Sequence, residues 1–148
     1  MPNKNRSRVL LIKSLGKDSG LLSPRYPTDC GYDLKSSVDI ILPPGQQYPI
    51  DIPSGVCVKL PSGTWGLIVG RSSTIRKMGI EVQLGVIDEN FTGELLACCY
   101  NRTNAPVKVE RDMRLAQLIL MKRVPVELSS VDELPETDRG KKGFGSTN

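Results

Sequence analysis

Two groups of polar residues in this chain have types and spacing that could do chemistry on a substrate. Arg71 is followed by two hydroxyl residues, Ser72 and Ser73, at the predicted start of a short helix. A guanidinium fork, backbone N–H groups and the positive end of a helix together favour phosphate. Asp88 lies between the apolar Ile87 and a polar turn, where its carboxylate can be held beside a substrate while it remains ionised. The structural alternative is a capped surface helix and a turn aspartate that bonds its own backbone.

The last ten residues, 139–148, combine glycine and positive charge with one aromatic side chain, Phe144. The other residues of this segment are too small or too polar to bury the Phe144 ring. Gly145, Ser146 and Thr147 add the backbone and hydroxyl donors that a polyphosphate needs for close contacts. The composition therefore predicts a small, flat, anionic partner, a nucleotide. A frayed, solvated terminus is the alternative.

The residue types that are absent or unpaired limit the possible chemistry. The sequence of 148 residues contains no histidine, which removes the commonest general base and metal ligand. Its cysteines, Cys30, Cys57, Cys98 and Cys99, have neither a zinc-site spacing nor a secreted disulfide framework. We expect buried free thiols in a reducing cytosol, and we expect carboxylates and electrostatics to carry any catalysis.

Composition and charge favour one globular domain. The chain is 39% hydrophobic and 24% charged, and its net charge of +4 is spread along the sequence rather than massed, which argues against a nucleic-acid groove. The apolar run at 9–12 is too short for a signal peptide, and no run reaches membrane length. We expect a cytoplasmic protein, or one of the host-cell cytosol or nucleus if the source is viral, with no nucleic-acid or membrane partner.

The hydrophobic pattern predicts an all-β fold. Apolar residues alternate with polar ones at 56–60 and 107–109, and turn residues recur at 43–45, 61–63 and 101–106. Near-continuous apolar runs at 65–69, 94–100 and 115–121 predict strands covered on both faces. Only residues 72–78 have the composition of a short helix, for which Ser72 or Ser73 is the expected N-cap.

Five short clusters lie at the ends of these predicted strands and at the C-terminus. They are Cys-Gly-Tyr-Asp-Leu at 30–34, Gly-Arg-Ser-Ser at 70–73, Gly-Val-Ile-Asp-Glu-Asn-Phe-Thr-Gly-Glu at 85–94, Arg-Leu-Ala-Gln-Leu at 114–118 and Gly-Phe-Gly-Ser-Thr at 143–147. Their order and spacing resemble the five motifs of the trimeric dUTPase family, the deoxyuridine triphosphate nucleotidohydrolases, from about residue 26 to the end. The resemblance implies a jelly-roll-like barrel or sandwich subunit of a homotrimer, with sites at subunit boundaries.

The resemblance also implies domain limits and an activity. Residues 1–138 would form the β domain, with 1–24 as an N-terminal arm and first strand, and 139–148 would be a flexible motif that closes over substrate. The implied reaction is Mg²⁺-assisted hydrolysis of dUTP to dUMP and pyrophosphate by attack of water on the α-phosphate. This reaction limits uracil incorporation into DNA and supplies dUMP for dTMP synthesis.

Site roles follow from the matching motif positions. Asp88 would activate the water, while Arg71 and Ser72 would hold the phosphates, and Asp33 would lie near the hydration shell of Mg²⁺ held mainly by the triphosphate. The implied substrate-binding residues are Ser73, Gly85, Val86, Ile87, Phe91, Leu96, Gln117, Arg139, Phe144, Gly145, Ser146 and Thr147. Among these, the 85–87 backbone and Leu96 would read uracil and sugar, Phe91 would exclude a ribose 2′-hydroxyl, and Phe144 would stack on the base.

Four positions depart from the family pattern and keep two other functions open. Ser73, Lys142 and Asn148 stand where the family usually has Gly, and Phe91 stands where it usually has Tyr. One alternative is a dCTP deaminase, alone or bifunctional, but the position of the deaminating glutamate, ten residues after Asp88, is Cys98. The other is a catalytically weak, nucleotide-binding regulator of the same fold.

Overall fold

The computed structural model describes residues 8–16, 24 and 26–143, which form ten strands and one short helix. In chain order these elements are β1 (Leu11–Ser14), β2 (Gly31–Lys35), β3 (Ile40–Leu42), β4 (Ile50–Lys59), β5 (Thr64–Gly70), α1 (Ser72–Met78), β6 (Ile80–Val82), β7 (Gly85–Ile87), β8 (Glu94–Asn101), β9 (Val107–Val109) and β10 (Arg114–Lys122).

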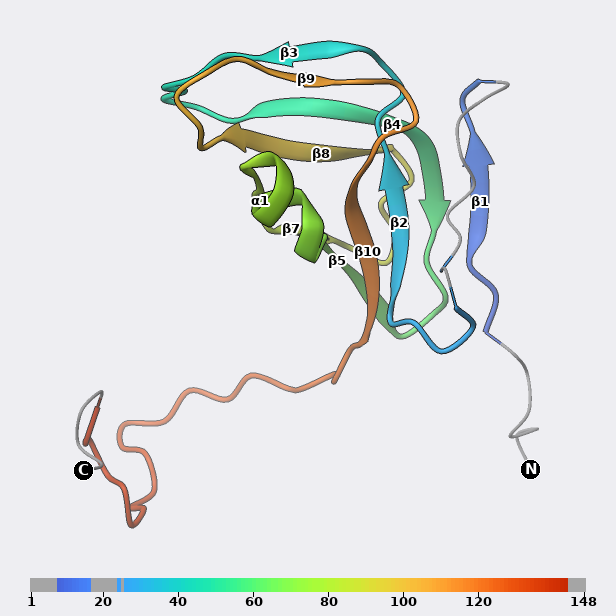
Figure 1. Ribbon diagram of the computed structural model, residues 1–148. Coiled ribbons are helices and arrows are strands. Elements are labelled where there is room, and N and C mark those ends of the chain that lie inside the picture. The colour runs from blue at the N-terminus through green and yellow to red at the C-terminus, as the bar shows by residue number, and fades with distance from the viewer. Residues whose placement is uncertain (1–7, 17–23, 25, 144–148) are drawn as a thin grey trace.

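The strands form two four-stranded sheets and one two-stranded ribbon (Figure 1). The strand order is β1-β4-β8-β6 in the first sheet and β2-β10-β5-β7 in the second, and β3 pairs with β9. Every pair is antiparallel. The prediction of an all-β, sandwich-like fold is therefore confirmed, and the second sheet carries Asp33, Gln117 and residues 85–87 of the predicted site.

Alternating side chains of both sheets build the core. In β4, Val56 and Val58 are 1% and 2% exposed and Leu60 follows at 2%, whereas Cys57 and Lys59 are half-buried. This is the alternation expected from the sequence, because successive residues of a strand point to opposite faces. Leu34, Leu42, Ile52, Ile68, Ile80, Leu95, Ala97, Cys99, Val109, Leu115, Ala116 and Leu118 complete the buried apolar set.

The apolar runs at 94–100 and 115–121 are not covered on both faces, so that prediction is wrong for them in a single chain, whereas every residue of 65–69 is buried or half-buried. In β8, Leu95 and Ala97 are buried, but Leu96 between them is 39% exposed. In β10, Met121 is likewise 39% exposed. Each antiparallel sheet packs one face on the core and leaves apolar side chains on the other. Such a surface is suited to contact with another subunit.

Helix α1 begins and ends where the sequence predicts, at Ser72 and Met78, but its expected cap is wrong. The N-cap is Arg71, with extended φ and ψ of −81° and 151°, and no side chain among the described residues caps the helix. Because Ser72 and Ser73 are already within the helix, neither occupies the position from which a side chain caps the first turn. At the other end Gly79 adopts a left-handed φ of 66°.

The chain after β10 leaves the body of the subunit (Figure 1). Residues 123–143 form no helix or strand, and every one of them is exposed. The sequence boundary expected at 138 and 139 thus falls within one extended segment.

Candidate functional site

Four of the predicted site residues line one cavity of about 350 Å³. It opens where β2 and β10 meet the start of α1, and its lining residues are Asp29, Cys30, Gly31, Asp33, Arg71, Ser72, Gln117 and Ile119. We call it the arginine cavity. The register explains how it forms: on β10, Gln117 pairs with Asp33 of β2 on one side and with Val69 of β5 on the other. Arg71 and Ser72 then follow directly from the end of β5.

Asp33 lies between two arginine side chains in this cavity. Its Oδ1 accepts from Arg71 Nε at 2.8 Å, and its Oδ2 accepts from Arg114 Nη1 at 2.9 Å. The Asp33 side chain is only 12% exposed, so both pairs are partly shielded from solvent. Asp29 also lines the cavity, so its charged groups balance, and the guanidinium groups offer directed N–H donors to an anionic ligand rather than an excess of positive charge.

Gln117 reaches the cavity because residue 31 is glycine. A Cβ at Gly31 would lie 2.0 Å from Gln117 Oε1 and 2.8 Å from its Cδ. On the other side of β10, Gln117 Nε2 donates to the Gly70 carbonyl oxygen at 3.3 Å. The amide is thus held between the backbones of β2 and β5.

A second cavity, of about 310 Å³, shares Arg71 and Ser72 with the first. Its other lining residues are Gly70, Ile75, Arg76, Ile80, Glu81 and Val82. Arg71 and Ser72 therefore form the wall between two openings. Ser73, which the sequence assigns to substrate binding, lines neither of them and is half-buried in α1.

Asp88 and Phe91 are the two ends of a short turn that follows β7. The Phe91 N–H donates to the Asp88 carbonyl oxygen at 3.0 Å, and both residues are exposed. The Phe91 ring lies close over Gly93, where a Cβ would approach ring Cζ to 2.7 Å. Val86 in β7 is 67% exposed. We call residues 88–91 the Asp88 turn; it presents a carboxylate and an aromatic ring beside an apolar strand.

The Asp88 turn and the arginine cavity lie at opposite ends of β5. Ile87, directly before Asp88, pairs with Gly66, whereas Arg71 follows Gly70 at the other end of the strand. Four residues of strand span about 13 Å, farther than an aspartate side chain can bridge. Within one chain the Asp88 turn and the arginine cavity therefore do not meet.

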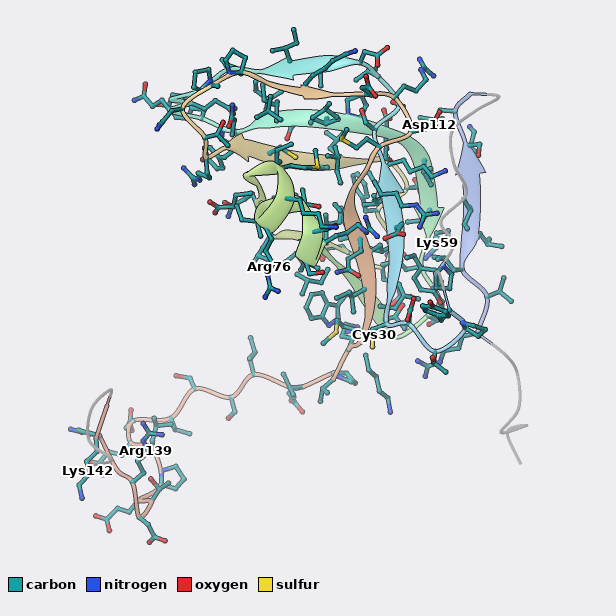
Figure 2. The ribbon with its side chains drawn as sticks, viewed as in Figure 1. Cys30, Lys59, Arg76, Asp112, Arg139 and Lys142 are labelled. Atoms are coloured by element: carbon teal, nitrogen blue, oxygen red, sulfur yellow. The ribbon has the colours of Figure 1, made fainter. Side chains whose placement is uncertain are left out.

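Arg139 lies outside both the arginine cavity and the Asp88 turn. It is exposed on the extended C-terminal segment, where its Nε donates to the Lys142 carbonyl oxygen at 3.0 Å. Figure 2 shows both residues well away from the β sandwich. The other predicted site residues of the tail, Phe144, Gly145, Ser146 and Thr147, lie outside the described residues.

The cysteines do not replace the missing deaminase glutamate. Burial raises the pKa of the Cys98 thiol to about 11, and a hydrogen bond and the negative charge of Asp51 act in the same direction. Burial likewise raises the pKa of Cys99 to about 12, with the charges of Cys98 and Asp51 adding to it. Both thiols are protonated at neutral pH, and neither serves as a base there. All four cysteines are free, as expected, but the prediction that they are buried holds fully only for Cys99: Cys57 and Cys98 are half-buried, and Cys30 is exposed beside the arginine cavity.

Sequence reasoning missed three residues that hold the site. Arg114 lies within a recognised cluster but received no role; its pairing with Asp33 follows only from the bulged register of β2 and β10. Lys59 and Glu89 hold the Asp88 turn through a side-chain-to-backbone hydrogen bond, which no spacing in the sequence indicates.

The described residues contain no group of three or more His, Cys, Asp or Glu that could hold a metal ion. None of the helices in this part of the chain is long and apolar enough to cross a membrane.

Comparisons with known proteins agree on one family. A sequence model of the family described as dUTPase matches residues 17–148. The chain is 38% identical over 138 residues to the deoxyuridine 5'-triphosphate nucleotidohydrolase of Paramecium bursaria Chlorella virus 1, covering 93% of this chain and 96% of that protein. It is 36% identical over 136 residues to the enzyme of the same name from Arabidopsis thaliana, covering 92% and 81%.

The fold is similar as well. The solved structure of the Staphylococcus bacteriophage 80alpha dUTPase with dUPNHPP superimposes with a TM-score of 0.88 at 26% sequence identity. The match covers 96% of this chain and 99% of that one.

Proposed function

The chain belongs to the dUTPase family, and we propose that it hydrolyses dUTP to dUMP and pyrophosphate. The observation that carries this proposal is the arginine cavity, where Asp33, Arg71, Ser72 and Gln117 come together from two strands and a helix start. These are the residues that the family motifs assign to the triphosphate. The remaining assigned groups, on the Asp88 turn, are exposed and available to a substrate.

In this proposal the Asp88 turn and the arginine cavity perform different parts of the reaction. Asp88 accepts a proton from a water molecule, whose oxygen attacks the α-phosphorus of dUTP, and the bond to the β,γ-pyrophosphate breaks. Arg71, Ser72 and Gln117 donate to phosphate oxygens and stabilise the charge that the leaving pyrophosphate gains. Catalysis in this arrangement comes mainly from positioning and charge, with proton transfer as a smaller factor. Phe91 lies under the deoxyribose and excludes a 2′-hydroxyl.

The residues fit a Mg²⁺ ion that arrives with the nucleotide. Asp33 is the acidic side chain of the arginine cavity nearest the phosphate donors, and its oxygens already accept from Arg71 and Arg114. Such a carboxylate is suited to accept from a metal-bound water rather than to bind the metal directly, and Mg²⁺ usually keeps several waters. The ion would neutralise charge on the triphosphate.

Assembly into a homotrimer completes the site in this proposal. A closed three-fold ring uses a heterologous interface, so one end of β5 in one subunit can face the other end in its neighbour. Exposed apolar side chains support such contacts: Leu96 is 39% exposed, and Val124, Val126 and Leu128 beyond β10 are 75%, 75% and 93% exposed. In this arrangement Asp88 of one subunit serves the arginine cavity of the next.

The tail closes the site. Residues 139–148 would reach a boundary between other subunits, where Arg139 holds the γ-phosphate and Phe144 stacks on uracil. Gly145, Ser146 and Thr147 would donate to the outer phosphates. The described part of this segment, 139–143, is exposed and forms a turn, so its side chains are available to a neighbouring subunit. We place the reaction in the cytosol, or in the host cytosol or nucleus if the source is viral.

One assay separates the candidate functions. Purified protein is incubated with dUTP, dCTP or UTP and Mg²⁺, and dUMP, pyrophosphate and deaminated products are measured. We expect dUMP and pyrophosphate from dUTP, with little product from UTP or dCTP. Conversion of dCTP to dUTP or dUMP would favour the deaminase instead. Binding of dUTP without any product would favour the regulatory module.

A further inference from the structure

Lys59, a residue outside every sequence cluster, holds the Asp88 turn. It is the last residue of β4, and its ammonium Nζ donates to the Glu89 carbonyl oxygen at 2.8 Å. The same Nζ lies 3.5 Å from Asn90 Oδ1. Glu89 and Asn90 are the two middle residues of the turn, so one side chain contacts both.

Glu89 also attaches the turn to the connection between β4 and β5. Its Oε2 accepts from the Gly63 N–H at 3.0 Å. That connection is itself well fixed, because the N–H and the hydroxyl of Thr64 both donate to the Pro61 carbonyl oxygen, at 3.2 and 2.6 Å. Thr64 is only 4% exposed. The Asp88 turn is therefore held to a rigid part of the sandwich rather than left to solvent.

The position of the middle of this turn decides the position of both ends. The hydrogen bond from Phe91 N–H to the Asp88 carbonyl closes the turn at 3.0 Å, so its ends move together with Glu89. Phe91 has no hydroxyl with which to anchor its ring. The backbone of the turn and the space over Gly93 are left to orient it.

We propose that Lys59 is a positioning residue that fixes the Asp88 carboxylate and the Phe91 ring together. Through Glu89 and Asn90 it sets the rate of hydrolysis and the choice of deoxyribose over ribose at once. This inference rests on the proposed function and adds to it a specificity-determining residue from β4. A displacement of about 1 Å at a reacting group is enough to cost about 10²-fold in rate.

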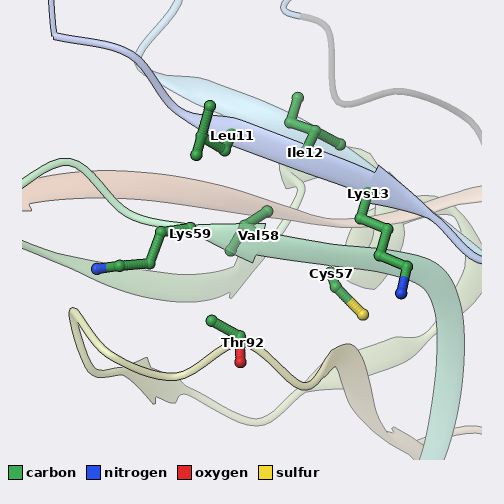
Figure 3. A pocket seen from close by; sticks show the side chains of 7 residues that line it. All are labelled: Leu11, Ile12, Lys13, Cys57, Val58, Lys59 and Thr92. Atoms are coloured by element: carbon green, nitrogen blue, oxygen red, sulfur yellow. The ribbon is translucent and has the colours of Figure 1, made fainter.

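A second lysine nearby supplies a matched control. Lys13 of β1 and Lys59 line the same cavity of about 210 Å³, together with Leu11, Ile12, Cys57, Val58 and Thr92. Figure 3 shows the two lysine side chains at opposite ends of this cavity. Among the described residues, no hydrogen bond joins Lys13 to the turn, so removing its charge leaves the turn in place.

The test compares Lys59→Met, Lys59→Arg and Lys13→Met by kcat and KM for dUTP and UTP and by thermal unfolding. Lys59→Met keeps the apolar stem and removes the donor; we expect kcat for dUTP to fall about 10–100-fold. The ratio of kcat/KM for dUTP over UTP should fall about tenfold, because the ring no longer has one position. Lys59→Arg, which retains donors, should recover part of both, and Lys13→Met should stay within about twofold of wild type.

The outcomes separate a failure of the role proposed for Lys59 from a failure of the proposed dUTP hydrolysis. Wild-type protein that fails to hydrolyse dUTP contradicts the proposed function. Wild-type activity with an unchanged Lys59→Met contradicts the role of Lys59 alone. Equal losses for dUTP and UTP, with their ratio retained, would mean that Lys59 supports only the fold and would also overturn the inference. In an Asp88→Asn background, Lys59→Met should cause no further loss of kcat.

Discussion

Asp33 is the residue at which the charges of the arginine cavity meet. Its carboxylate pairs with Arg71 from the end of β5 and with Arg114 from β10, at 2.8 and 2.9 Å. The pairs orient Arg71 before any substrate arrives, which lowers the entropy that must be lost on binding. An arginine held in this way presents its remaining N–H groups to a phosphate.

Gly31 permits Gln117 to lie in the cavity, and this gives a prediction for a single added methyl group. Gly31→Ala should displace the Gln117 amide, since the new Cβ would lie 2.0 Å from Oε1, while the fold survives because that atom ends a flexible side chain. We expect kcat/KM for dUTP to fall about tenfold, as for the loss of one phosphate donor.

A double-mutant cycle measures whether this loss acts through Gln117. In a Gln117→Ala background, Gly31→Ala should have almost no further effect on kcat/KM, because the displaced group is already gone. Additive losses in the double variant would show instead that Gly31 acts on the cavity by another route.

At the scale of elements, the helix and its C-cap carry a prediction about stability. Gly79 ends α1 with φ of 66°, and a Cβ there would lie 2.3 Å from Thr103 Cγ2. Thr103 cannot easily turn away, because its hydroxyl donates to Asn101 Oδ1 at 2.7 Å. Gly79→Ala should therefore cost about 1–2 kcal/mol for backbone strain and about 1–3 kcal/mol more for the clash.

A matching substitution at Gly45 separates the cost of backbone strain from the cost of the clash with Thr103. It has nearly the same φ, 67°, but a Cβ there meets no atom within 4 Å. Gly45→Ala should lower the free energy of unfolding by the strain alone. Urea denaturation at equal protein concentration compares the two variants, and equal losses would mean that the contact with Thr103 contributes nothing.

The elements that the sequence predicts best are those whose pattern is local. The alternation around Val56 and Val58 requires only a strand with one buried face, and α1 requires only seven residues of suitable composition before Gly79. The prediction of the helix cap was wrong because the N-cap is set by the backbone conformation. The extended backbone at Arg71 makes this residue the N-cap. The shape of the arginine cavity was not predictable, since it depends on the register that places Gln117 opposite Asp33.

The site residues were found through their motifs, and this limits what sequence can reveal. Asp33, Arg71, Ser72 and Gln117 gather as the motifs imply. The sequence does not indicate a role for Lys59, because its place in an alternating strand marks it only as a polar residue between buried neighbours. Its hydrogen bond to the Glu89 carbonyl joins residues thirty positions apart, and no local pattern indicates such a contact.

At the scale of the whole molecule, the C-terminal segment should matter for activity and not for stability. Residues 139–143 are exposed and add nothing to the core. Deleting residues 139–148 should shift the melting temperature by no more than about 2 °C, because the buried core is built by the strands that precede this segment. The kcat/KM for dUTP should fall by about 10²-fold or more, since closure orders the attack and excludes water.

Calorimetry and steady-state kinetics on the same preparation test the deletion, with Lys142→Gly as the control that keeps the tail. Activity within a few-fold of wild type after deletion would show that the site works without closure. A large drop in melting temperature would show that the segment is part of the folded body.

The most direct test of the proposed active site is whether Asp88 of one subunit acts with Arg71 of another. Asp88→Asn and Arg71→Ala damage opposite ends of β5, and each variant alone should lose nearly all dUTP hydrolysis. Refolded together, they should regain activity at about one quarter of the boundaries, where an intact Asp88 meets an intact Arg71. A mixture of Asp88→Asn and Asp88→Ala is the control and should stay inactive. If native mass spectrometry finds mixed trimers and the first mixture remains as inactive as its components, Asp88 and Arg71 do not act across a subunit boundary.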